Sequence, residues 1–201
     1  MEPVQKTPKS TNVISSLPLN PNEILMAEYE FAAQTAFQAN EDRIKVFSYF
    51  LANIGTLIAA IALPAFIDIV SYTFFAGIFL LLFVVGILTM LQLVKVRMAW
   101  YESAKAMNQI KDYYIDTFQN VNFSKAFRWR TTNIPKPDKV FTIAYLLGLT
   151  TMILNSISLA AALFLFVRNE YKIEIVLPSI LVGLTVLLIQ NIVWFSILRE
   201  N

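Results

Sequence analysis

Four long runs of the chain contain no charged residue, and they dominate its pattern. They cover about residues 46–67, 72–94, 140–167 and 175–198. As a helix, each run is long enough to cross a hydrocarbon layer of about 30 Å, and none carries the polar stripe of a helix in a soluble bundle. The pattern predicts an all-α integral membrane protein with four transmembrane helices. The first two are joined by a short turn and are predicted to extend into a long antiparallel cytoplasmic helical hairpin.

The second helix of this hairpin is predicted to run unbroken over residues 71–118. No Pro or Gly interrupts the join between its uncharged half, residues 72–94, and its charged half, residues 95–118. The first helix is predicted to begin at Asn20, which can cap it, with Pro21 at the first helical position and Glu23 completing a capping box. The two polar stretches, residues 20–45 and 95–118, are therefore predicted to be arms of nearly equal length.

The two arms carry complementary faces, small residues on the first and bulky residues at heptad spacing on the second. We predict that these faces form a seam between the arms. The predicted seam residues are Leu25, Ala32, Ala36 and Ala39 on the first arm, and Val96, Trp100, Met107, Ile110 and Tyr114 on the second. In the alternative, both arms lie flat on the membrane. This is disfavoured because four carboxylates of the first arm would then face an anionic leaflet.

The remaining segments divide the chain further. Residues 1–19 are predicted to be a flexible tail, residues 119–139 a basic and aromatic connector, and residues 140–201 a second transmembrane hairpin. Within the connector, the mixture of cations and aromatic rings predicts a membrane-interface anchor formed by Lys125, Phe127, Arg128, Trp129 and Arg130. Three cations supply too little charge for a typical nucleic-acid site, so we expect no nucleic-acid partner.

The positive charges predict the orientation in the membrane. Of 16 Lys and Arg residues, four precede the first run, nine lie between the second and third, and one follows the fourth. The other two lie in the connection between the third and fourth runs. The positive-inside rule then predicts a multi-pass protein of the cell membrane with both termini in the cytoplasm.

Polar but uncharged side chains inside the runs are the candidate intramembrane contacts: Asn53, Asn155, Gln190 and Asn191. They either line an aqueous path or hydrogen-bond one helix to another. The chain has no Cys and no His, and no ionisable residue lies inside a run. This composition argues against thiol chemistry, the usual zinc and copper sites, and proton relays. We therefore expect a non-enzyme without a metal or cofactor.

Two stretches resemble the SLATT-type membrane proteins of bacterial conflict systems. They are the entry to the first run, ANEDRIKVFSYFLANIG (residues 39–55), and the exit from the second, VKVRMAWYESAKAMNQIKDYY (residues 94–114). The resemblance is one of layout and covers about half of the chain. It implies a transmembrane hairpin flanked by long cytoplasmic helices, acting as a membrane effector beside a nucleotide-sensing partner.

Three functions are compatible with these patterns. The first is an oligomeric membrane effector or pore-forming component, gated through its cytoplasmic hairpin. The second is a channel or facilitator for a small solute or ion, and the third is a membrane scaffold or assembly factor for a cytoplasmic partner. The expected partners are the lipid bilayer and further copies of the same chain, with a cytoplasmic protein on the hairpin as a further candidate.

Overall fold

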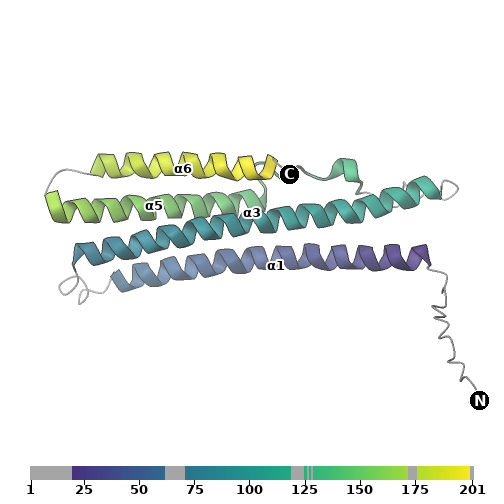
Figure 1. The fold of residues 1–201 in the computed structure, drawn as a ribbon, viewed down its shortest axis with the longest axis horizontal. Helices are drawn as coiled ribbons and strands as arrows, with labels where there is room; N and C mark the ends of the chain where they lie inside the picture. The colour runs from purple at the N-terminus through teal and green to yellow at the C-terminus, as the bar shows by residue number, and fades with distance from the viewer. Residues whose placement is uncertain are drawn as a thin grey trace, which may run out of the picture.

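Helices account for nearly all of the chain that can be described. The computed structural model describes residues 20–61, 71–118, 125, 127, 129–171 and 176–199, and no strand occurs among them. The long helices are α1 Pro21–Ile61, α3 Tyr72–Thr117, α5 Ile143–Tyr171 and α6 Val176–Arg199, and a short 3-10 helix, η1, covers Thr131–Asn133. Figure 1 shows the four long helices lying side by side in one elongated bundle. The all-α prediction is therefore confirmed.

The first two helices begin at capping residues. The Asn20 side-chain oxygen accepts a hydrogen bond from the backbone N–H of Asn22 at 3.2 Å, and the Asn20 amide donates to Glu23 at 3.0 Å. Ser71 caps α3 by accepting a hydrogen bond from the N–H of Phe74 at 3.3 Å. From that cap α3 runs for 46 residues without interruption, as the sequence predicts.

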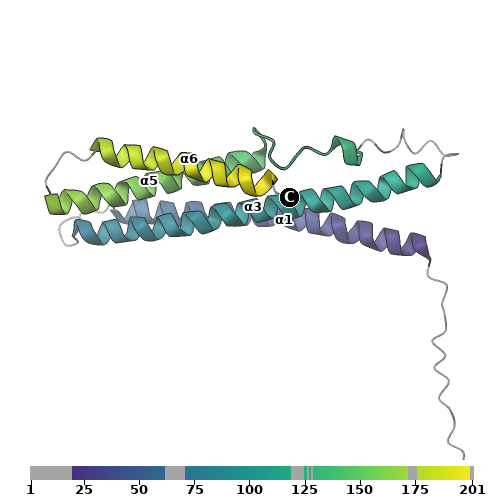
Figure 2. The same ribbon diagram turned by 45° about the horizontal axis from the view of Figure 1, so that its top comes forward.

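α1 and α3 form an antiparallel hairpin along their whole described length (Figures 1 and 2). At one end, the Tyr114 hydroxyl of α3 lies 3.5 Å from the Asn22 side-chain oxygen of α1. Toward the other end, Phe50 of α1 is almost fully buried in a core cluster with Leu82 of α3. We call residues 21–45 of α1 and residues 95–117 of α3 the polar arms.

α5 and α6 pack beside the apolar half of α3 and stop near its midpoint (Figure 1). Their shared core combines side chains from all three helices: Met90, Leu93, Val94 and Met98 of α3, Met152 of α5, and Trp194 and Leu198 of α6. The polar arms extend beyond this three-helix core. The apolar half of the molecule is therefore the half in which the most helices pack together.

Three of the described helices are long and apolar enough to cross a membrane: α3, residues Ile143–Arg168 of α5, and α6. The described residues therefore contain three of the four predicted spans, not four. The exception is α1, whose described apolar part ends at Ile61 and includes the polar side chains of Ser48 and Asn53. Residues 62–67 of the predicted first run lie outside the described residues, as does the predicted tail over residues 1–19.

Candidate functional site

The predicted intramembrane polar residues differ sharply in their surroundings. Asn155 is fully buried and Gln190 is 3% exposed. Asn191 is half-buried, where it accepts a hydrogen bond from the Tyr145 hydroxyl at 3.5 Å and donates to the Leu187 carbonyl at 3.1 Å. Asn53 instead lies exposed on α1. The structure thus buries two of the four predicted residues and leaves one on the surface of the single chain.

Asn155 packs directly on a glycine of the neighbouring helix. A β-carbon on Gly86 of α3 would lie 2.5 Å from Cγ of Asn155, far inside the van der Waals contact of two non-bonded carbons. Only the absence of a side chain at residue 86 therefore allows the carboxamide to lie between α3 and α5. Both positions are buried, so this contact belongs to the interior of the bundle.

The buried amides lack the hydrogen bonds that most neighbouring hydroxyls make. Thr89, Thr151 and Ser158 each donate to the backbone carbonyl four residues earlier. By contrast, among the described residues, the side-chain oxygen and nitrogen of Asn155 and of Gln190 are buried without a partner. A buried amide without a partner is costly, so these two residues are the polar groups most in need of a ligand, water or partner side chain.

α5 and α6 pack closely through two further glycines. The ring of Trp194 lies against Gly148, where a β-carbon would be 2.6 Å from the ring, and Gly183 lies against the backbone of Ser156. Beside this contact is a groove of about 430 Å³ with an almost wholly apolar lining. The buried Ser156 and Ser179 hydroxyls line it and, within the described chain, have no hydrogen-bond partner.

The predicted seam residues differ in burial between the two polar arms. On α1, Ala32, Ala36 and Ala39 are buried and Leu25 is half-buried. The bulky seam residues of α3 are all half-buried: Val96, Trp100, Met107, Ile110 and Tyr114. This burial agrees with the predicted seam, in which small side chains on α1 would let the two backbones approach.

The outer surface of the α1 arm carries apolar side chains that this chain does not cover. Met26, Phe37 and Ile44 are 65%, 66% and 59% exposed. Their spacings of eleven and seven residues are close to whole numbers of helical turns, so they lie on one line along the helix. The same line continues at Leu51 and Ile58, both exposed, on the apolar half of α1. We call Met26, Phe37 and Ile44 the apolar stripe.

The connector is held against the α3 arm. Arg130 forms an ion pair with Asp112 of α3, the Thr131 N–H donates to the same carboxylate at 3.2 Å, and the Asn108 amide donates to the Arg130 carbonyl at 3.3 Å. Burial raises the pKa of Asp112, but the hydrogen bonds from Thr131 and Arg130 and the charge of Arg130 outweigh it and hold that pKa below its ordinary value. We call the pairing of Arg130 and Thr131 with Asp112 the connector clasp.

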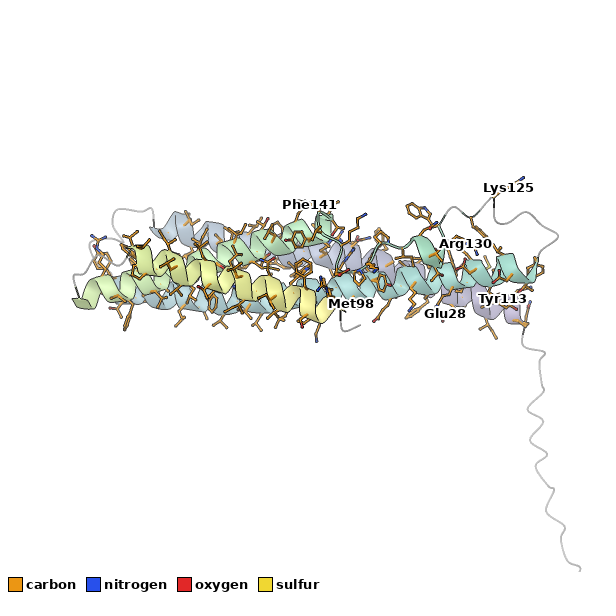
Figure 3. All side chains as sticks on the ribbon, turned by 90° about the horizontal axis from the view of Figure 1, so that it is seen from above. Glu28, Met98, Tyr113, Lys125, Arg130 and Phe141 are labelled. Atoms are coloured by element: carbon orange, nitrogen blue, oxygen red, sulfur yellow. The ribbon has the colours of Figure 1, made fainter. Side chains whose placement is uncertain are left out.

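This clasp gives Arg130 a partner within the protein, whereas the sequence predicts an anchor at the membrane interface. Figure 3 shows Lys125 and Arg130 beside the polar arms, well apart from Phe141 near the start of α5. Asp112 lies 18 residues beyond Val94, which is about 27 Å along a helix. Of the other predicted anchor residues, Lys125 and Trp129 are exposed, Phe127 is half-buried, and Arg128 lies outside the described residues.

Two features of the site have no clear signal in the sequence. The glycine contacts of Asn155 and Trp194 depend on how three helices align, although Gly residues inside apolar runs mark positions where such contacts can form. The connector clasp depends on the path of a segment that lacks periodicity. Comparison of the chain with protein-family models, curated proteins and solved structures finds no match.

Proposed function

We propose that this protein is a non-enzymatic, oligomeric membrane protein that acts as an effector or pore-forming component, gated through its polar arms. The observation that carries the proposal is the apolar stripe. Met26, Phe37 and Ile44 lie on the polar arm of α1, where lipid would not cover them if that arm stands outside the membrane. Exposed apolar side chains on such a surface are stabilised by a protein partner.

The partner that fits best is a second copy of the chain. Two copies inserted in the same membrane share one orientation, so their α1 helices meet in parallel and each stripe residue faces its own counterpart. The stripe extends to Leu51 and Ile58, so one contact would join both the arms and the apolar halves. Asn53, exposed on another face of α1, is a second group that further protein contacts would stabilise.

In this proposal α1 is the fourth membrane-crossing helix, and both arms and both termini lie in the cytoplasm. Because α3 continues for 46 residues from its apolar half into its arm, about 69 Å of helix links the cytoplasm to the membrane. A partner that moves the arms would therefore move the apolar half of α3 as well. The proposal agrees with the layout of SLATT-type effectors.

Release of a dye from liposomes tests the effector role. We expect wild-type protein to release an encapsulated ionic dye, and the triple variant Met26→Ser, Phe37→Ser and Ile44→Ser to release several-fold less because it no longer forms the oligomer. Phe31→Ser is the matched control, since Phe31 is equally exposed, at 66%, but lies off the stripe. Absence of release by the wild-type protein under any trigger would contradict the effector role.

The second candidate is a channel or facilitator for a small solute or ion. It is favoured by the unpartnered amides of Asn155 and Gln190, which could exchange hydrogen bonds with a passing solute. In this case Asn155→Leu should abolish flux through reconstituted protein while leaving its oligomeric state unchanged. Equal flux through the variant and the wild type would exclude a conducting role for that amide.

A further inference from the structure

Two arginines come near each other where the apolar half of the hairpin meets the polar arms. Lys111 of α3 lies over the ring of Tyr29 of α1. Arg97 lies fourteen residues before Lys111, and Arg43 lies fourteen residues after Tyr29. Because the helices are antiparallel and fourteen residues is close to four turns, this register brings Arg97 opposite Arg43. Burial lowers the pKa of both guanidinium groups, and the charge of Arg43 lowers the pKa of Arg97 further. The two cations therefore lie close enough to repel each other.

The donors of this pair are not satisfied by the chain. Arg97 is only 5% exposed; its Nε donates to the Pro137 carbonyl at a long 3.5 Å, and its guanidinium lies 5.0 Å from the centre of the Trp100 ring. One terminal nitrogen of Arg97 and the Nε of Arg43 are buried without a hydrogen-bond partner among the described residues. Two like charges with free N–H groups are thus held together between α1 and α3.

Two carboxylates of the surrounding segments are occupied elsewhere, and Asp42 forms no ion pair among the described residues. Glu41 pairs with Lys45 at 3.3 Å, and Asp138 pairs with Arg199 at 3.2 Å. Within the described chain, neither Arg43 nor Arg97 forms an ion pair with a carboxylate. Burying Arg97 beside the half-buried Arg43 without a counter-charge is unfavourable, so the geometry calls for an anion from outside the chain.

The position of the pair indicates which anion. Arg43 lies three residues before the first apolar run and Arg97 three residues after the second, so both lie at the depth of the lipid headgroups. Guanidinium groups match phosphate oxygens in shape and charge. We propose that Arg43 and Arg97 together bind one phosphate group, supplied either by the phosphodiester of an anionic lipid or by free inorganic phosphate. Because Arg43 is half-buried, the anion can reach the pair from its side.

Two probes on the full-length protein test this site and its source of phosphate. In uncharged detergent, the melting temperature is measured in inorganic phosphate and in chloride at equal ionic strength. In parallel, native mass spectrometry counts phosphatidylglycerol molecules retained after release from nanodiscs of phosphatidylcholine and phosphatidylglycerol. We expect the wild-type protein to respond to at least one probe, and Arg43→Gln and Arg97→Gln each to bind that probe about tenfold more weakly.

Arg199→Gln is the matched control, because it removes the same charge from a side chain that is 69% exposed and already paired with Asp138. It should respond as the wild type does. A response to phosphate alone assigns the site to the free anion, and retained phosphatidylglycerol assigns it to the lipid headgroup. The proposal is overturned if the wild type responds to neither probe, or if Arg43→Gln binds as the wild type does. Arg43 is less buried than Arg97, so Arg43→Gln is the variant expected to fold. Its binding result therefore tests the site even if Arg97→Gln does not fold.

Discussion

Asn155 of α5 fills the space that a side chain at residue 86 of α3 would occupy, and that residue is Gly86. The predicted consequence is that Gly86→Ala lowers the free energy of unfolding by about 1–3 kcal/mol, because the new methyl group displaces the Asn155 carboxamide. Thermal or denaturant unfolding in detergent micelles measures the change.

The control for this substitution lies on the same helix. A β-carbon on Gly77 would meet nothing within 4 Å, so Gly77→Ala should be neutral or stabilising by up to about 1 kcal/mol. Adding Asn155→Ala to Gly86→Ala should recover part of the lost stability. Equal stability of Gly86→Ala and Gly77→Ala would show that the close contact is absent.

The seam between the polar arms should tolerate no larger side chain on α1. Ala36 is 7% exposed against α3, so Ala36→Leu is expected to cost about 1–3 kcal/mol by overpacking. Ala27→Leu adds the same atoms at an exposed position of the same arm and should change stability by less than about 0.5 kcal/mol. Thermal unfolding with proteolysis of the arms distinguishes the two, and indistinguishable variants would argue against packing along this face.

The connector clasp should open in acid. Because Asp112 has a lowered pKa in the folded protein, its stabilising effect is present above its ordinary pKa of about 4 and is lost as the pH falls through the lower folded value. Cleavage of the connector by pepsin, which acts at low pH, should therefore increase as the pH falls below about 4.

A neutral amide at residue 112 should remove the part of the pH dependence of connector cleavage that comes from Asp112. Asp112→Asn should weaken the clasp by about 1 kcal/mol and leave the connector susceptible already at pH 5. Glu102→Gln neutralises an exposed carboxylate on the same arm, and its connector should be cleaved with the wild-type pH profile. This variant therefore corrects for the pH dependence of pepsin itself. If Asp112→Asn keeps the wild-type pH profile, Asp112 does not hold the connector.

Local patterns predicted the helices well. The unbroken α3 follows from the absence of Pro and Gly at the join of its two halves, and the start of α1 follows from Asn20 and Glu23. The number of membrane spans could not be predicted in the same way. The first apolar run is described only to Ile61, and Ser48 and Asn53 interrupt that part.

The environment of individual polar residues could not be predicted. Asn53 and Asn155 both lie within apolar runs, yet only Asn155 meets a glycine on a neighbouring helix and becomes buried. The partner of Arg130 depended on the route of the connector, which has no periodicity to fix it. Likewise, the meeting of Arg43 with Arg97 depended on the hairpin register, which neither helix specifies alone.

Disulfide cross-linking in membranes shows whether two copies of the chain meet along the apolar stripe. The chain has no Cys, so a single introduced cysteine reports on one position. Phe37→Cys is the test, with its two neighbours as controls: Ala36→Cys is buried in the seam and Gln38→Cys is exposed off the stripe. If the stripes meet, mild oxidation gives a cross-linked dimer with Phe37→Cys and little with either control. A Phe37→Cys protein that remains monomeric, or that cross-links no better than Gln38→Cys, would contradict a contact along the stripe.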